Sequence, residues 1–139
     1  MSATDEVRAL TLRFYEMFSS GDARAASELI SAEGGTLVIG TDPSEWWSDR
    51  GEIVNTLGAQ AKEISESGIR IEPGEIVARA EDGIAWVADR PKFVMPDGSA
   101  VEARVTGVFR REGGSWKIAQ WHASLGVQNE EAIGQALTT

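Results

Sequence analysis

Apolar side chains recur every three or four residues at the start of the chain, which predicts an amphipathic helix from about Ala3 to Ser20. Ser2 and Asp5 stand three positions apart at the beginning of this repeat, a spacing typical of a helix-capping box. Gly21 follows the last apolar position and is expected to end the helix. The chain therefore begins with a helix that has one apolar face to bury.

Two further helices are expected in the first half of the chain. Asp22 is the predicted cap of a short second helix. A short β-branched strand from Thr36 to Ile39 comes next, followed by a loop over residues 40–48. Asp49 opens a third helix with an apolar stripe, and Gly68 is its predicted stop.

After the third helix the pattern changes to strands and turns. Strands are expected over residues 69–77, 84–95, 101–111 and 115–125. Asp97-Gly98 is typical of a two-residue hairpin turn, which would pair Val94 with Val101. Helices followed by a sequential antiparallel meander indicate an α+β fold in a single domain, residues 1–139. The sheet is expected to curl around the three helices.

The last expected strand holds two of the five Trp residues and the only His. Side chains alternate between the two faces of a strand. One face is therefore predicted to carry Trp116, Ile118, Gln120, His122 and Ser124, and the other to carry Lys117, Ala119, Trp121, Ala123 and Leu125. The first face begins apolar and ends polar, which predicts a strand that runs from a packed core into a pocket.

Charge and composition exclude several classes of function. The net charge of −9 disfavours binding to nucleic acid or to an anionic membrane. With no Cys and one His, no metal site is expected, and no organic cofactor is expected either. The N-terminus does not resemble a signal peptide, and no apolar run reaches the ~20 residues that span a bilayer. These features favour a cytoplasmic protein.

Three stretches carry a resemblance to a known superfamily: residues 13–22, Thr41-Asp42-Pro43, and residues 104–124 with their Arg-Val-Thr, Trp-Lys-Ile and His-Ala-Ser motifs. Their order and spacing resemble the SnoaL-like and ketosteroid isomerase-like members of the nuclear transport factor 2-like superfamily. The resemblance implies a cone-shaped α+β barrel, with a curved antiparallel sheet around three N-terminal helices, and a homodimer through the outer face of the sheet. It implies no single activity, because the superfamily includes isomerases, cyclases, dehydratases, hydrolases and non-catalytic domains.

The resemblance makes Asp42 the candidate general base, since an Asp in a similar Asp-Pro context moves the proton in ketosteroid isomerases. Partial burial would suit Asp42 to this role by raising its pKa. The alternative is a turn residue that accepts backbone N–H groups. His122 is the second catalytic candidate, as a base or as a donor to a ligand carbonyl. Its alternative is a buried structural His bonded to a neighbour such as Ser124.

Ketosteroid isomerase activity itself is not expected. The family places a Tyr on the first helix, and the matching position here is Phe14. Tyr15 lies about 100° further round that helix. The strand segment that should supply a protonated acid, residues 105–108, has no carboxylate. Both oxyanion donors of the isomerase are therefore predicted to be missing.

The remaining candidates are ligand-binding residues. The predicted hairpin register places Arg104 diagonally opposite Asp89, which indicates either an anion clamp for a carboxylate ligand or a surface ion pair. Trp46 and Trp47 are expected to wall an apolar pocket with Trp86, to cover the core or to form a dimer contact. The predicted ligand-binding set is Phe14, Trp46, Trp47, Trp86, Arg104, Gln120 and Ser124.

Two functions follow from these expectations. The first is a small-molecule pocket with cofactor-free acid/base chemistry, such as isomerisation, cyclisation or dehydration. Its ligand would be apolar with one polar end, a carboxylate or a ketone. The second is a non-catalytic ligand-binding or dimeric assembly module. Convergence of Asp42 and His122 on one cavity would favour the enzyme.

Overall fold

Helix α1 (Ala3–Ser20) forms where the apolar repeat predicts it, and local hydrogen bonds fix both of its ends. The Ser2 hydroxyl accepts the Asp5 N–H at 3.2 Å, and the Asp5 carboxylate accepts the Ser2 N–H at 3.3 Å. Gly21 adopts φ 76°, a left-handed conformation that costs glycine little, and its N–H reaches the Met17 carbonyl at 3.0 Å. The predicted capping box and stop are confirmed.

The other helices are α2 (Ala25–Leu29), α3 (Arg50–Glu66) and α4 (Asn129–Ile133). Helix α3 begins as predicted, because the Asp49 side chain accepts the Glu52 N–H at 2.9 Å. The predicted cap of α2 is wrong. Arg24 is its N-cap and makes no side-chain cap bond, whereas Asp22 contributes only its backbone carbonyl, to Ala25.

The structure, a computed structural model, describes residues 1–139 and confirms the α+β class. Its strands are β1 (Leu37–Ile39), β2 (Trp46–Trp47), β3 (Arg70–Glu72), β4 (Val77–Glu81), β5 (Ile84–Asp89), β6 (Lys92–Val94), β7 (Ala100–Glu112) and β8 (Ser115–Leu125). They pair in the order β2-β1-β8-β7-β5-β4, while β6 pairs with β7 and β3. The sheet is mixed and unclosed, because β1 runs parallel to β8 and no bond joins β2 to β4.

The sheet has more strands than the predicted four-strand meander. The predicted loop over residues 40–48 contains β2, which pairs antiparallel with β1. The single strand predicted over residues 84–95 is broken into β5 and β6 at Arg90-Pro91, where proline has no N–H for the ladder.

Two irregularities decide which side chains face inward. The hairpin between β6 and β7 has a three-residue loop, because Met95 donates its N–H to the Ser99 carbonyl at 2.8 Å and Val94 pairs with Ala100. The predicted two-residue turn is therefore wrong. A bulge then interrupts the ladder between β7 and β8. Val108 pairs with Gln120 and Phe109 with Ile118, so Ala119 is an extra residue.

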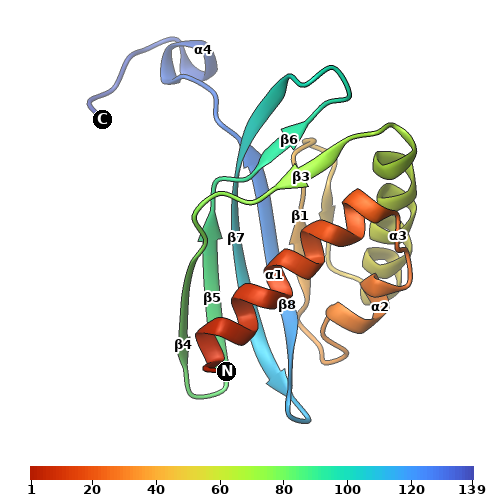
Figure 1. Cartoon of the computed structure of the whole chain (residues 1–139). Coiled ribbons are helices and arrows are strands. Elements are labelled where there is room, and N and C mark those ends of the chain that lie inside the picture. The colour runs from red at the N-terminus through yellow and green to blue at the C-terminus, as the bar shows by residue number, and fades with distance from the viewer.

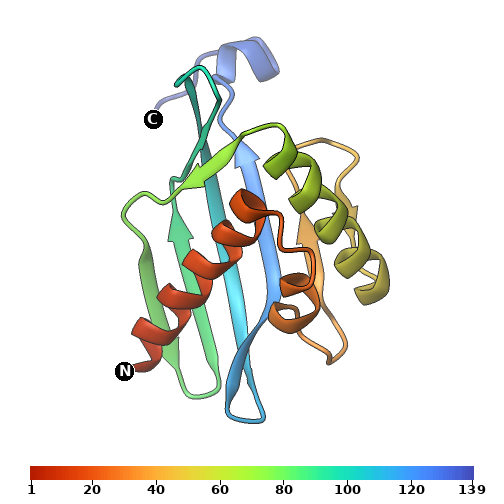
Figure 2. The same ribbon diagram turned by 45° about the vertical axis from the view of Figure 1, so that its right-hand side comes forward.

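Figures 1 and 2 show α1 lying across one face of the curved sheet with α2 and α3 beside it, while the other face has no helix over it. The core fills the space between α1 and the sheet, and its fully buried side chains include Val7, Met17, Val87 and Phe109. Helix α4 projects beyond the end of β8 and buries no residue (Figure 1). None of the helices combines the length and the apolar character required to cross a membrane.

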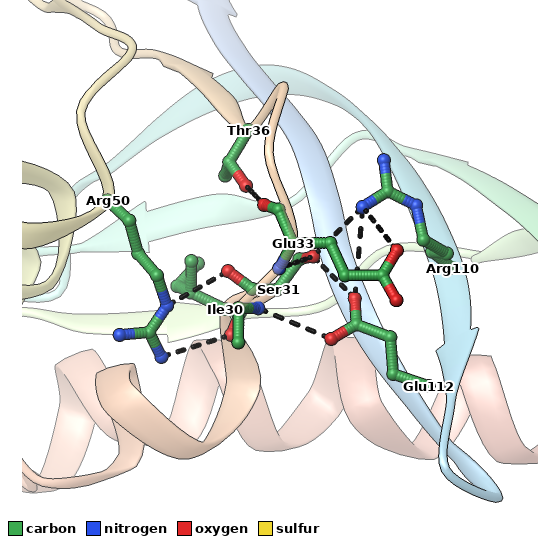
Figure 3. A network of polar contacts seen from close by, with 8 residues as sticks. Ile30, Ser31, Glu33, Thr36, Arg50, Arg110 and Glu112 are labelled. Carbon is green, nitrogen blue, oxygen red and sulfur yellow. Dashed lines mark hydrogen bonds and ion pairs between the residues drawn. The ribbon is translucent and has the colours of Figure 1, made fainter.

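A polar network ties the chain after α2 to the far end of β7 (Figure 3). Ser31 is fully buried and donates its hydroxyl to Glu112, and it accepts a bond from Arg110 at 3.1 Å. Arg50 of α3 donates to the Ser31 carbonyl at 2.9 Å. Arg110 also pairs with Glu33 at 3.3 Å. The buried Ser31 hydroxyl thus has partners among half-buried and exposed charged residues, and none of these residues lines the pocket described below, which favours a structural role.

Candidate functional site

A pocket of about 290 Å³ lies between α1, α3 and the inner face of the sheet, and most of its lining residues are hydrophobic. Six of the ten aromatic residues of the chain line it: Phe14, Tyr15, Phe18, Trp47, Phe93 and Trp121. The volume lies near the lower end of the ~300–1,000 Å³ range of small-molecule sites. The arrangement is therefore that of a site for a small apolar molecule.

The buried wall of the pocket is one continuous run of aromatic rings. The Phe14 ring centroid lies 5.2 Å from that of Phe18 and 4.7 Å from that of Trp121, and Tyr15 lies 6.2 Å from Trp121. Gly107, paired with Trp121 on the next strand, makes room for the indole. A Cβ there would lie 2.6 Å from the Trp121 ring. The position requires glycine because the ring rests on the backbone.

The rim of the pocket is polar and carries a fixed carboxylate. Glu45 is half-buried, and its two carboxylate oxygens accept bonds from the Asp42 backbone N–H at 2.9 Å and from Gln60 Nε2 at 2.6 Å. Gln60 and Glu63 reach the rim from α3, where they share a face with Leu57 and Ile64. Glu45 thus has a defined orientation and keeps lone pairs for a ligand.

A second polar pair lies where α1 meets β5. The Tyr15 hydroxyl donates to Asp89 at 2.8 Å, and Asp89 also accepts the N–H groups of Gly74 at 3.1 Å and Arg90 at 2.8 Å. Asp89 is 6% exposed. Burial raises the pKa of the Tyr15 hydroxyl well above its usual range, and the bond to the Asp89 carboxylate raises it further. Tyr15 therefore stays protonated, and its hydroxyl donates a hydrogen bond to Asp89.

Asp42, the predicted base, does not line the pocket. It is exposed, and its carboxylate accepts the Ser44 N–H at 2.9 Å and the Ser44 hydroxyl. These bonds lower the pKa of Asp42 from its ordinary value. A lowered pKa weakens a general base. The contacts match the alternative considered for this residue, a turn that organises Asp-Pro-Ser-Glu.

His122 lies on the opposite side of the sheet from the pocket. It is exposed together with Gln120, whereas Trp121 is 4% exposed and lines the pocket with Ala123. The predicted common face of Trp116, Ile118, Gln120, His122 and Ser124 is therefore wrong. The bulge at Ala119 moves the residues after it to the other face, since strand side chains alternate. Asp42 and His122 do not converge on one cavity.

Arg104 and Asp89 lie on opposite faces of the sheet. Asp89 pairs with Val105 rather than Thr106, because the loop at residues 96–98 has three residues instead of two. Asp89 is buried beside α1, while Arg104 is exposed and pairs with Ser124. The predicted ion pair is wrong, and Arg104 does not reach the pocket.

The predicted aromatic walls divide between the two faces. Phe14 and Trp47 line the pocket, as expected. Trp46 and Trp86 point away from it and are 65% and 43% exposed. They share the uncovered outer face with Arg104 and His122. The expected homodimer through that face stays a prediction.

Sequence reasoning missed the residues with the best-defined polar geometry. Glu45 is absent from the predicted set of site residues, yet it lies two positions before Trp47, and both residues line the pocket. Recognising β2 as a strand would have shown this. Phe14 occupies the helix position where the family has a Tyr, and Tyr15 next to it also lines the pocket. Trp121 was placed on the outer face because the bulge leaves no clear signal in the sequence.

Comparisons with known proteins concern the family and the fold of the chain. The model of a family described as a SnoaL-like domain matches residues 7–128, which is most of the chain. No curated protein matches the sequence. Many solved structures match the fold.

Among them is a nuclear transport factor 2-like protein of unknown function from Pseudomonas putida, with 16% identity and a TM-score of 0.80 over 97% of this chain and 93% of that one. A provisionally assigned ketosteroid isomerase from Parabacteroides distasonis has 15% identity and a TM-score of 0.70 over 90% and 89%. A provisionally assigned dehydratase of the same fold family from Streptomyces avermitilis has 22% identity and a TM-score of 0.70 over 89% and 96%. At these identities the likeness shows the cone-shaped α+β fold alone.

Proposed function

The chain belongs to the SnoaL-like domain family, within the nuclear transport factor 2-like superfamily, and from that premise we propose that its pocket binds a small, mostly apolar molecule and moves a proton on it. The reaction class is isomerisation or dehydration. The provisional names of the Parabacteroides and Streptomyces neighbours support this class, although fold alone does not select it.

The observation that carries the proposal is the Glu45 carboxylate on the rim of an aromatic pocket. General acid/base catalysis needs a proton acceptor held within reach of an acidic C–H or O–H bond. Glu45 is held by the bonds from Asp42 and Gln60, so it does not have to be ordered when the ligand binds. Glu45, rather than Asp42, is therefore the proposed base.

The surrounding residues support proton transfer in two ways. The apolar walls exclude water from the bound ligand, which strengthens electrostatic interactions at the reacting atoms. The side-chain amide of Gln60 donates one N–H to Glu45, and its second N–H is free to donate to an oxygen of the ligand. That second donor suits the charge that develops on a carbonyl oxygen as its α-proton leaves.

The proposal is tested by hydrogen exchange into a bicyclic ketone such as alpha-tetralone in deuterated buffer, followed by proton NMR. This assay detects proton abstraction without knowledge of the natural product. The native protein is expected to accelerate exchange at the α-carbon. Glu45→Gln is expected to lower the protein-dependent rate about 100-fold or more while ligand binding persists, since general base catalysis contributes ~10²–10⁴.

Two variants control this experiment. Glu102→Gln removes the same charge from the exposed outer part of β7 and is expected to leave exchange unchanged. Asp42→Asn tests the competing base. If exchange vanished with Asp42→Asn and survived Glu45→Gln, the proposed role of Glu45 would be wrong. Binding with no accelerated exchange in the native protein would favour a non-catalytic binding module.

A further inference from the structure

The charged residues that line the pocket are all acidic. Its ionisable rim residues are Glu45 and Glu63, and none of the lining residues is Lys, Arg or His. Arg104, the predicted clamp for an anion, and His122, the predicted base or donor to a carbonyl, lie on the outer face. A ligand carboxylate would therefore lose water beside two carboxylates and gain no counter-charge.

The hydrogen-bonding capacity of the pocket also favours a donor on the ligand. Glu45 is an acceptor at every free lone pair. Tyr15 lines the pocket but commits its proton to Asp89, so its oxygen can offer only an acceptor. Gln60 and Thr41 supply neutral donors at the rim. Neutral donors can hold a carbonyl, but they do not offset the repulsion of two carboxylates toward an anion.

The aromatic wall adds a second preference. Ring faces carry a partial negative charge, and an ammonium group within about 6 Å of a Trp, Tyr or Phe ring centroid is attracted to it. Phe14, Tyr15, Trp47 and Trp121 are all part of the lining. Rings together with carboxylates recognise organic cations, whereas rings alone would accept any apolar group.

We propose that the pocket selects ligands without negative charge, and that among ligands with the same apolar body it binds an ammonium more tightly than a hydroxyl and a hydroxyl more tightly than a carboxylate. This inference rests on the proposed function, because it names the ligand class of the same pocket. The apolar body of the ligand packs against the buried rings, and its donor group meets Glu45 and Glu63 at the rim.

A matched trio of ligands tests the proposal with the native protein. Tryptamine, tryptophol and indolepropionate share an indole and a two-carbon chain, and they end in an ammonium, a hydroxyl and a carboxylate. Titration calorimetry at neutral pH is expected to rank tryptamine first and indolepropionate last, with a difference in Kd of at least about 10-fold. Equal or tighter binding of indolepropionate would overturn the proposal and leave the pocket itself intact.

Charge variants locate the source of the preference. Glu45→Gln combined with Glu63→Gln is expected to narrow the tryptamine-to-indolepropionate ratio to within about 3-fold, since the local carboxylates are gone. Glu102→Gln combined with Glu81→Gln removes two charges from exposed positions outside the pocket and is expected to preserve the ratio. A ratio that falls equally in both double variants would contradict recognition in the pocket. No binding by any of the three ligands would also overturn this proposal, while exchange into alpha-tetralone would still decide the proposed function.

Discussion

The two faces of the β7–β8 pair differ in burial and in the chemistry of their side chains. The inner face carries Val105, Trp121 and Ala123, which line an apolar pocket. The outer face carries Arg104 and His122, which are charged or polar, exposed and remote from that pocket. Residues with conspicuous chemistry thus lie on the solvent side, while the polar groups of the pocket come from α1, α3 and the segment before β2.

The difference shows how little separates a pocket residue from a surface residue in a sheet. Side chains alternate with a period of two, so one added residue exchanges the faces of everything that follows. The bulge at Ala119 does this in β8, and the three-residue loop over residues 96–98, one residue longer than predicted, does it between β6 and β7. Each irregularity adds one residue. The bulge places His122 on the outer face, and the longer loop places Arg104 on the face opposite Asp89.

The strongest test of this contrast replaces one Trp on each face. Trp121→Ala is expected to lower the free energy of unfolding by about 3–5 kcal/mol, because it opens a cavity beneath α1 and leaves Phe14 and Tyr15 without their partner ring. Trp86→Ala is expected to cost less than about 1 kcal/mol, since its side chain is already partly in water. Urea denaturation of both variants measures the difference.

Measuring the melting temperature at several protein concentrations tests whether Trp86 lies in a dimer contact. If Trp86 lies in the predicted homodimer contact, the Trp86→Ala variant should lose melting temperature only at concentrations where the native protein is dimeric. A large loss of stability in Trp86→Ala at every concentration would contradict the assignment of Trp86 to an exposed face.

Replacing Asp89 or Arg104, the two residues predicted to form an ion pair, is expected to lower stability by less than Trp121→Ala. Asp89→Ala is expected to cost about 2–3 kcal/mol, because the Tyr15 hydroxyl and the Gly74 N–H lose their buried acceptor. Arg104→Ala is expected to change stability by no more than about 0.5 kcal/mol. The double variant, measured by the same denaturation, should show additive effects, since the side chains lie on opposite faces. A coupling energy between Asp89 and Arg104 well above the experimental error would instead support the predicted ion pair.

The mildest probe is alkaline pH, which reports on Tyr15, the only tyrosine in the chain. Its pKa is raised in the folded state, so the neutral hydroxyl stabilises the fold fully below the ordinary pKa of about 10. Above that pH the unfolded chain ionises first, and stability falls by up to about 1.4 kcal/mol per pH unit. Tyr15→Phe should remove this part of the alkaline loss.

Absorbance at the phenolate band follows the same group directly. The folded protein should show no tyrosinate signal near the ordinary pKa, and the signal should appear together with unfolding. Ionisation of Tyr15 near its ordinary pKa in a folded protein would show that the hydroxyl is open to water and is not held by Asp89.

Much of the fold could be predicted because its signals are local. The capping box at Ser2, the stop at Gly21 and the start at Asp49 each depend on residues within a few positions. The strand β2 was harder to predict because its two residues are too few to show the alternation of a strand. The division of β5 from β6 was harder because β6 is defined in part by its pairing with β3, at least 20 residues earlier. The residues of the candidate site were the hardest to predict, because their position depends on which face of each strand is buried.

The sequence by itself determined both ends of α1, the start of α3, the α+β class and the family resemblance, and it placed Phe14 and Trp47 among the candidates for a pocket wall. Those features rest on periodicity, caps and motif order, which short segments encode. The tertiary structure alone decided that Glu45 and Tyr15 belong to the pocket and that Asp42, Arg104 and His122 do not. The reason is physical: register in a sheet is set by packing and hydrogen bonds between distant strands, and a shift of one residue exchanges inside for outside.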